Sequence, residues 1–288
     1  MRRSTAPAPL LRAAHAAYVG LFFVWLALPL VVVAVFAFNA APFPGLPWQG
    51  TTLDWFLGAS DPRIGLFYDR NIIRGIGNSL LVAAATTTLS LLVGTTSAFL
   101  FERFGFRFKG LCYMLMLLPL VIPGVILGIS ILAFSSSVAN WADGRLGLEL
   151  AALRPGLWLV VAGQFSFIAT IATLVISARL RKFDRALEEA ALNLGATPLS
   201  VLRTITLPYL APALIGSGLV AFLMSFENFN TTLMLAGSDP PLTITMFDRM
   251  RQGSTPVLNA VSVFLMVASG LLGLLSVLVQ RRGPAAAE

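Results

Sequence analysis

The chain has 288 residues, of which 57% are hydrophobic and only 11% are charged, and its mean hydropathy is +0.83. A soluble domain of this length cannot bury so much apolar surface, so the composition predicts an integral membrane protein. The net charge of +7 does not indicate nucleic-acid binding, because the Lys and Arg residues punctuate apolar runs, as they do where they encode membrane topology. A single cysteine, Cys112, excludes an intrachain disulfide, and a single histidine, His15, excludes a histidine-based metal or catalytic cluster.

Six apolar runs are long enough to cross about 30 Å of hydrocarbon at roughly 20 residues per helix. They lie near residues 17–38, 76–100, 111–134, 157–178, 208–230 and 257–280. We therefore predict an all-α membrane protein with six transmembrane helices. Its expected parts are an N-terminal segment at 1–16, a six-span domain at 17–280 and a tail at 281–288. The first run exceeds the roughly 7 to 15 apolar residues of a signal peptide, which favours an uncleaved span.

The distribution of basic residues predicts the orientation of the chain. With the N-terminus inside, thirteen Lys and Arg residues fall in cytoplasmic segments and seven fall outside. Both termini are therefore expected in the cytoplasm. The outside loop at 39–75 is the longest, and it carries Trp48 and Trp55, whose amphipathic rings suit the membrane interface.

The third run contains Pro119, Pro123 and Gly124, which would break or loosen a helix within the membrane. Irregular backbone at that depth is tolerated only where protein or water satisfies it, which favours a position on a substrate pathway. The alternative is a proline kink packed against a neighbour, with Gly124 and Gly128 forming a contact of small residues. Both interpretations are open at this point.

A polar insert at 180–207 separates the fourth and fifth runs. Asp184 is expected to cap a short helix that Gly195 ends, because glycine readily adopts the left-handed conformation just past a helix. Thr197 and Pro198 form the typical start of a second helix. The apolar positions of the first helix recur at helical spacing, at Phe183, Leu187, Ala190, Ala191 and Leu194.

The insert leads directly into the fifth run, which Pro208 opens, so we expect stiff coupling between the two. The small side chains of Ala190 and Ala191 would allow a partner to approach closely, and Glu189 offers one charge to a basic group. A short amphipathic insert can also lie on lipid headgroups. The residues alone favour neither explanation.

Glu227 lies in the outer half of the fifth run, where a carboxylate costs roughly 2 to 3 kcal/mol on insertion scales. We therefore expect it to face a cavity rather than lipid, with Asn228 and Asn230 adding hydrogen-bonding groups nearby. Together with Pro119 and Pro123, these residues form the predicted substrate pathway. The alternative is an interfacial glutamate that is paired with a neighbouring subunit or exposed to water.

The spacing E-A-A, three residues, Gly, nine residues, Ile, one residue, Leu-Pro resembles the cytoplasmic "EAA" loop of ABC-importer permeases. The matching residues are Glu189, Ala190, Ala191, Gly195, Ile205, Leu207 and Pro208. The similarity also covers residues 53–56, 78–80, 118–124 and 259–260. The chain thus resembles a six-span type I importer permease along most of its length.

The resemblance implies a set of partners in a bacterial inner membrane, with lipid around the spans. Two permease subunits would form the pathway, the second being a homologous but different chain, while two ATPase subunits would grip the seven motif residues. An extracytoplasmic binding protein would deliver the ligand, and the amphipathic outside segment at 241–253 would either touch that protein or cap the pathway. The chain has no G-x-x-x-x-G-K-[ST] phosphate loop, so ATP is expected on the ATPase chains. No cofactor, metal ligand or catalytic residue is expected here.

The substrate is less sharply indicated. The fifth run and the segments at 240–244 and 253–260 are similar to permeases that import putrescine and spermidine, and a cationic ligand would suit Glu227. Related permeases carry opines or amino-acid-like solutes, which stay as alternatives. A secondary transporter would normally show inverted repeats and several intramembrane ion-coupling residues, and a membrane scaffold would not need Glu227 or broken helices.

Overall fold

The computed structural model describes residues 9–61, 63–253 and 255–282, which divide into two compact units. One unit comprises Met1–Asp69 and Arg249–Ala268, and the other comprises Arg70–Asp248 and Ser269–Glu288. Six helices among the described residues are long and apolar enough to cross a membrane, as predicted.

The first unit begins with α1 (Pro9–Phe36) and includes α2 (Asp54–Leu57), a short hairpin of β1 (Ala59–Ser60) and β2 (Arg63–Ile64), and the first half of α12 (Pro256–Arg282). Helix α1 is apolar on all sides, and none of its most apolar window is buried within the chain. A helix of this kind is stable only when lipid or another subunit covers it. Helix α1 starts at Pro9 and its apolar part covers Ala13–Phe36, so the boundary at residue 17 between the cytoplasmic segment and the span stays a prediction. Residues 1–8 and 283–288 of the expected terminal segments lie outside the described residues.

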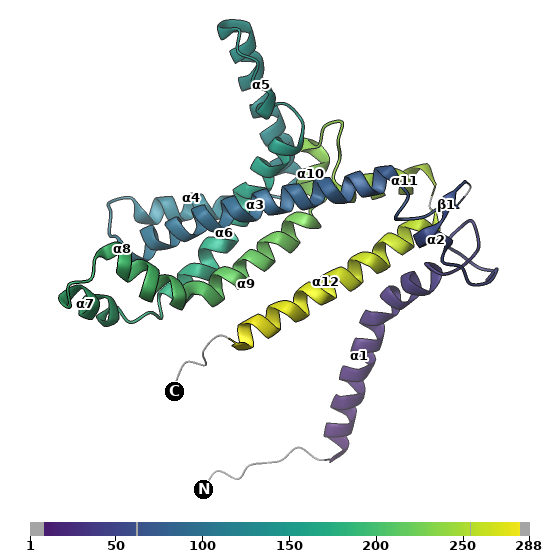
Figure 1. Ribbon diagram of the computed structural model, residues 1–288, viewed down its shortest axis with the longest axis horizontal. Helices are drawn as coiled ribbons and strands as arrows, with labels where there is room; N and C mark the ends of the chain where they lie inside the picture. Colours follow the sequence, from purple (N-terminus) through teal and green to yellow (C-terminus); the bar gives the residue numbers. More distant parts are fainter. Residues whose placement is uncertain (1–8, 62, 254, 283–288) are drawn as a thin grey trace. The chain divides into compact units, whose positions relative to one another are not determined.

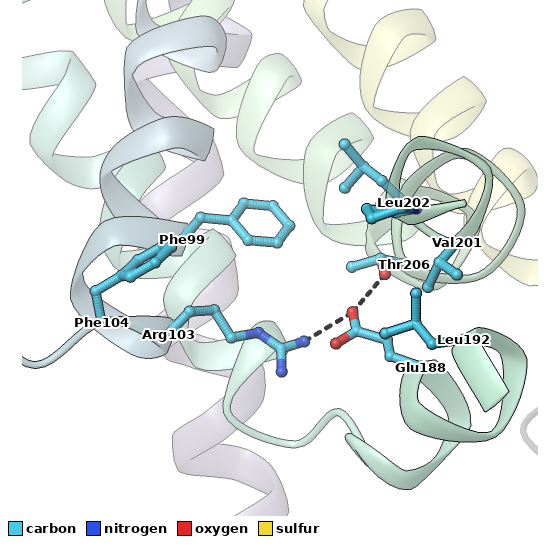
Figure 2. A pocket seen from close by; sticks show the side chains of 9 residues that line it. Phe99, Arg103, Phe104, Glu188, Leu192, Val201, Leu202 and Thr206 are labelled. Atoms are coloured by element: carbon cyan, nitrogen blue, oxygen red, sulfur yellow. Dashed lines mark hydrogen bonds and ion pairs between the residues drawn. The ribbon is translucent and has the colours of Figure 1, made fainter. Parts of the chain in front are cut away.

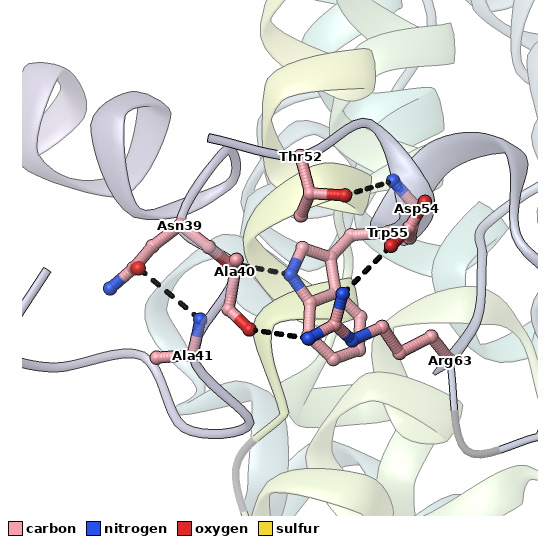
Figure 3. A network of polar contacts seen from close by, with 7 residues as sticks. All are labelled: Asn39, Ala40, Ala41, Thr52, Asp54, Trp55 and Arg63. Atoms are coloured by element: carbon pink, nitrogen blue, oxygen red, sulfur yellow. Dashed lines mark hydrogen bonds and ion pairs between the residues drawn. The ribbon is translucent and has the colours of Figure 1, made fainter. Parts of the chain in front are cut away.

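The loop between α1 and α2 is held by a polar network centred on Asn39, whose side chain is fully buried (Figure 3). The Trp55 indole Nε1 donates to the Asn39 carbonyl oxygen at 2.7 Å, and Arg63 donates to both Asp54 Oδ2 and the Ala40 carbonyl oxygen. The ring of Trp55 is therefore packed within the loop, 5% exposed and with its N–H group satisfied, whereas Trp48 is 43% exposed. A position of the two rings at the membrane interface stays a prediction.

The second unit is built around α6 (Leu157–Leu180), which packs against α3 (Arg70–Arg103) and α9 (Leu207–Phe226) (Figure 1). Helix α6 is the most buried of the spans, with 61% of its apolar window inside the chain. Gly94 of α3 permits the close approach, since a Cβ atom there would lie 2.9 Å from the Cβ atom of Ala172 on α6.

The third apolar run forms two helices rather than one, α4 (Lys109–Val121) and α5 (Gly124–Leu146). The predicted single span at 111–134 was therefore wrong in its boundaries, although the predicted break is present. Ile122 is extended, with ψ of 128°, because the ring of Pro123 disfavours a helical conformation in the preceding residue. Pro119, by contrast, lies inside α4.

The glycines after this break pack closely on α10 (Asn230–Leu235). Cβ atoms at Gly124 and Gly128 would lie 3.1 Å from the Asn230 Cβ atom and 3.0 Å from the Met234 Cβ atom, respectively. The small-residue contact proposed for these glycines is thus confirmed. A position of this break on a substrate pathway stays a prediction.

Five further elements are described, and all of them except α11 are short. They are η1 (Ala151–Leu153), α7 (Ala186–Asn193), α8 (Pro198–Val201), the π-turn η2 (Leu202–Thr206) and α11 (Leu242–Gln252). The other five predicted runs each correspond to one long helix, which are α1, α3, α6, α9 and α12.

Candidate functional site

The insert folds as the predicted helix, turn and second helix. Asp184 Oδ1 accepts a hydrogen bond from the backbone N–H of Ala186 at 2.9 Å, although Arg185 rather than Asp184 occupies the N-cap position of α7. Gly195 has φ of +87°, in the left-handed region that favours glycine. Thr197 then caps α8 by accepting from the Ser200 N–H, with Pro198 in the first turn.

The second helix of the insert continues into the fifth span without interruption. Residues 198–226 form one helical path that includes the π-turn η2, in which the Leu207 N–H donates to the carbonyl oxygen of Leu202, five residues earlier. Pro208 explains the wider turn, because proline has no N–H and its ring clashes with the carbonyl four residues before it. Helix α9 itself begins at Leu207 with Pro208 in its first turn, as expected, and the helical path that continues back to Pro198 provides the expected stiff connection.

Helix α7 presents an open surface. None of its residues is buried, and Leu187 and Leu194, two of its predicted apolar positions, are 53% and 90% exposed. Glu189 and Ala190 are also exposed, and among the described residues the Glu189 carboxylate has no hydrogen-bond or ion-pair partner. This side of α7 is therefore accessible to another chain.

The remaining motif residues lie on the path into the membrane. Ala191, Ile205 and Leu207 are half-buried, while Pro208 is exposed. Ile205 packs against a cluster formed by Leu180, Phe183 and Leu210, which joins the ends of α6 and α9. The seven motif residues thus lie in two places: four are on α7 and the Gly195 turn, where all but Ala191 are exposed, and three are in η2 and the start of α9, where all but Pro208 are half-buried.

Glu188, which the sequence analysis did not single out, points toward Arg103 and Thr206 (Figure 2). Its Oε1 atom accepts from Arg103 Nη2 at 3.0 Å and from Thr206 Oγ1 at 2.5 Å. These residues border an open pocket of about 250 Å³ between α3, α7 and α8. The one available signal was a second carboxylate directly before the motif, since adjacent helical residues point about 100° apart.

A second group of charges lies beside the insert at the ends of α3 and α6. Arg181 Nε donates to Glu102 Oε1 at 2.8 Å, and this hydrogen bond with the carboxylate raises the pKa of Arg181. The guanidinium of Arg179 lies over the Tyr209 ring, 4.2 Å from its centroid, and donates to the Tyr209 carbonyl oxygen. Such contacts fix the relative positions of these helix ends.

At the opposite end of α9, Glu227 follows the last helical residue, Phe226, and its side chain is exposed. No described residue pairs with its carboxylate. Asn228 is half-buried and Asn230 is exposed at the start of α10. Pro119 is half-buried and Pro123 is exposed, and whether these five residues line a pathway stays a prediction.

A buried polar network that the sequence analysis missed adjoins Asn228. The side chain of Gln164 on α6 is 1% exposed; its Nε2 atom donates to Thr232 Oγ1 at 2.9 Å, and its Oε1 atom accepts from Ser225 Oγ. Thr232 Oγ1 in turn donates to Asn228 Oδ1 at 3.0 Å. The only hint in the sequence was one amide inside an otherwise apolar run.

The segment before α11 is held by the start of α3. Asn78 Nδ2 donates to the carbonyl oxygens of Asp239 and Pro240, and Ser79 Oγ accepts from the Leu242 N–H at 2.9 Å. Residues 78–80 were noted in the sequence only for their resemblance to a family. Their contacts give Asn78 and Ser79 a structural role.

In the described part of the chain, no group of three or more His, Cys, Asp and Glu side chains is arranged to hold a metal ion. The arrangement offers instead an accessible helix, a rigid connection into a membrane span and a polar cluster at each end of that span. These features suit mechanical transmission better than chemistry on a bound substrate.

Comparison with known proteins identifies relatives along most of the chain. The family described as "Binding-protein-dependent transport system inner membrane component" matches residues 90–282. The putrescine transport system permease protein PotI of Escherichia coli K12 is 31% identical over 88% of this chain and 86% of its own length. The spermidine/putrescine permease PotC of Haemophilus influenzae is 27% identical over 92% of this chain and 96% of its own.

Solved structures show the same fold. A chain of a bacterial ABC transporter involved in the import of the acidic polysaccharide alginate matches with a TM-score of 0.75 at 20% identity, covering 96% of both chains. A chain of the MetNI methionine ABC transporter in an inward-facing conformation matches with a TM-score of 0.58 at 17% identity, covering 74% of this chain and 96% of its own.

Proposed function

The chain belongs to the family of inner membrane components of binding-protein-dependent transport systems, and from this membership we propose that it imports putrescine, spermidine or a similar small cation. As a member, it is a multi-pass membrane subunit of an ABC importer and not an enzyme. The family membership also removes a secondary transporter and an inert scaffold from consideration. The accessible α7, followed by the Gly195 turn and by a helix that runs without a break into a membrane span, is the observation that carries a coupling role.

The cationic substrate is supported by two relatives. PotI and PotC carry polyamine transport in their names, and this chain aligns with each of them over most of both lengths. The exposed carboxylate of Glu227 offers a cation an attractive charge, and the exposed Asn230 side chain, three residues on, offers a hydrogen-bond acceptor; Asn228, whose Oδ1 atom already accepts from Thr232, would help to hold this segment in place. An importer of opines or amino-acid-like solutes is the alternative, because the alginate transporter shows that this fold also accompanies an acidic substrate.

Coupling to ATP is proposed to run through the insert. The exposed Glu189, Ala190 and the Gly195 turn would seat against an ATPase subunit, together with the half-buried Ala191. When the ATPases close on ATP, the seated insert would move, and the continuous helix through Ile205, Leu207 and Pro208 would carry that motion into α9. The result is an exchange between inward-facing and outward-facing states. ATP stays on the ATPase chains.

The assembly is proposed to contain two ATPase subunits, this permease, a second permease that is homologous but different, and an extracytoplasmic binding protein. Alternating access then requires both termini and the insert on the cytoplasmic side, with Glu227 toward the outside. The substrate pathway is proposed to pass Glu227, Asn228 and Asn230 and the break between Pro119 and Pro123. The open carboxylate and the irregular backbone are the features that support it.

The proposal is tested by reconstituting the chain with candidate ATPase, second-permease and binding-protein chains from its source organism. We expect ATP-dependent uptake of radiolabelled putrescine or spermidine, with competition by the other polyamine but not by a neutral amino acid. Uptake of only neutral or anionic solutes would overturn the substrate. Uptake that survives ATP depletion and stops when the proton gradient collapses would overturn the coupling role.

A further inference from the structure

Glu188 lies within the insert but faces the membrane helices. Resting on the coupling role proposed above, we propose that Glu188 is a positioning residue that locks α7 to α3 through Arg103. An ATPase that moves the insert would then move two spans together, α9 through the continuous backbone and α3 through this lock.

The contacts of Glu188 join three elements at one oxygen atom. Oε1 of Glu188 on α7 accepts from Arg103 Nη2, in the last turn of α3, and from Thr206 Oγ1, at the end of η2. The side chains of Arg103 and Glu188 are 13% and 22% exposed, and Thr206 is 1% exposed. A charged pair this well shielded from water interacts more strongly and is less screened by salt than one on an open surface.

Packing alone does not fasten α7. No residue of this helix is buried, and the helix has only eight residues, so it contributes no side chain to an apolar core. Its attachment to the neighbouring helices must therefore come from its flanking turns and from polar contacts. Two contacts reach α3: Arg185, at the N-cap, donates from Nη2 to the Glu102 carbonyl oxygen at 2.9 Å, and Glu188 accepts from Arg103. The second is the one made by a residue within α7.

Arg103 is itself held in place. Its guanidinium lies 5.4 Å from the centroid of the Phe183 ring, which is 6% exposed. Phe183 in turn packs edge-on against Tyr209 of α9, with ring centroids 4.9 Å apart. The Phe183 ring, itself held by Tyr209 of α9, therefore restricts the movement of Arg103. A displacement of Glu188 is then transmitted to α3 through an arginine that has little freedom to move.

The two adjacent carboxylates of α7 have separate tasks under this proposal. Glu189 faces outward, where an ATPase would seat, and Glu188 faces inward, where the spans lie. The two side chains leave the same helix about 100° apart. Because both belong to one helix, an ATPase that displaces the outer face of α7 also displaces Glu188 and its contact with Arg103. Loss of Glu188 should therefore uncouple α3 while leaving the outer face of α7 intact.

The test compares Glu188→Ala, Arg103→Ala and the double variant in the fully reconstituted importer. We expect each single variant to assemble with the ATPase as the wild type does, to lose about tenfold in uptake, and to hydrolyse more ATP per solute moved. The double variant should be no worse than the worse single variant, because both remove one interaction. Glu188→Gln, which keeps the hydrogen-bond acceptor and loses the charge, should fall between Glu188→Ala and the wild type.

Arg181→Gln provides the matched control. It removes an ion pair between Arg181 and Glu102, which joins α6 to the same end of α3 at 2.8 Å without involving Glu188. We expect uptake and ATP consumption close to those of the wild type. An equal loss in this variant would show that any ion pair at the end of α3 matters and would overturn the specific role of Glu188.

A distance measurement separates a lock from general stabilisation. Spin labels at Leu100 on α3 and Asn193 on α7, in a Cys112→Ser background, should keep one narrow distance distribution through the ATP cycle, which should broaden in Glu188→Ala. Unchanged uptake and distances in Glu188→Ala would overturn the lock, and so would failure of that variant to bind the ATPase. If the wild type neither binds an ATPase nor needs ATP, the proposed function fails first and the lock falls with it.

Discussion

Polar contacts tie each end of α9 to neighbouring elements, but the groups that make these contacts differ between the two ends. At the insert end, Arg103 and Glu188 form an ion pair, and the Thr206 hydroxyl donates a hydrogen bond to the same carboxylate. The side chains of Arg103 and Glu188 are 13% and 22% exposed. At the opposite end, Gln164, with 1% exposure, joins Ser225 and Thr232 through neutral hydrogen bonds. Each cluster ties α9 or its continuation to other elements of the same unit.

The difference follows from the cost of removing charge from water. A fully buried ion pair loses hydration worth several kcal/mol per ion, whereas a neutral amide needs only partners for its own polar atoms. Ionic contact therefore appears where the ends of helices approach solvent, and an amide appears inside the helix bundle. At each end, the carboxylate that the sequence analysis singled out, Glu189 or Glu227, is exposed. The residue next to it in the chain, Glu188 or Asn228, makes the contacts with other helices.

The largest effect should come from breaking the neutral cluster. Gln164→Leu leaves the buried Ser225 hydroxyl without its acceptor and removes the donor to Thr232 Oγ1, which keeps its bond to Asn228; the loss should destabilise the protein by about 2 to 3 kcal/mol. The midpoint of thermal unfolding of the purified protein in detergent measures this loss of stability, and Gln252→Leu, at an exposed position, is the control. Equal midpoints for the two variants would mean that the cluster does not stabilise the bundle.

At the insert end, Gly195→Val should act next most strongly. A β-branched residue at φ of +87° costs roughly 1 to 2 kcal/mol, which corresponds to about a tenfold loss of ATPase association and uptake. Gly105→Val, in the nearby loop after α3 and outside the left-handed region, should have little effect. Co-purification of the ATPase and membrane insertion are measured together, and unchanged association would exclude the turn from the docking surface.

Glu227→Gln examines the exposed carboxylate at the far end of α9. Uptake of a doubly charged polyamine should fall several-fold more than uptake of any neutral solute that the importer accepts, because only the cation loses an attractive charge. Glu149→Gln, at another exposed carboxylate, should leave both unchanged. Equal losses for charged and neutral solutes would indicate a structural carboxylate.

The smallest effect is expected at an ion pair with no shielding. Asp54 and Arg63 form a pair 2.8 Å long with side chains 47% and 41% exposed, and the hydrogen bond from Arg63 lowers the pKa of Asp54 below its usual value of 3.8. A lowered folded-state pKa gives stability that is present above pH 3.8 and is lost as the pH falls through the folded value. Protease sensitivity of the 39–68 loop should therefore rise only in that acidic range, and Asp54→Asn should abolish the change. A transition near neutral pH would contradict this.

Much of the fold followed from local pattern. Apolar run length located five of the six spans, and the Gly195 turn and the Thr197 cap were correct because each depends on the conformational preference of one or two residues. The third span was misjudged, because the sequence shows that Pro123 interrupts a helix but not that α5 then extends to Leu146. The form of the connection before α9 could not be predicted either, since a π-turn joins this helix, which begins at Leu207, to the helix that starts at Pro198.

The sequence by itself determined the membrane class, the helix-and-turn form of the insert and the family resemblance, all of which depend on composition or on residues close together in the chain. Only the tertiary structure decided that Glu188 contacts Arg103, 85 residues away, and that Gln164 contacts Thr232, 68 residues away. Side-chain direction and burial depend on how separate helices pack, and no local preference of a residue records which distant neighbour it will meet.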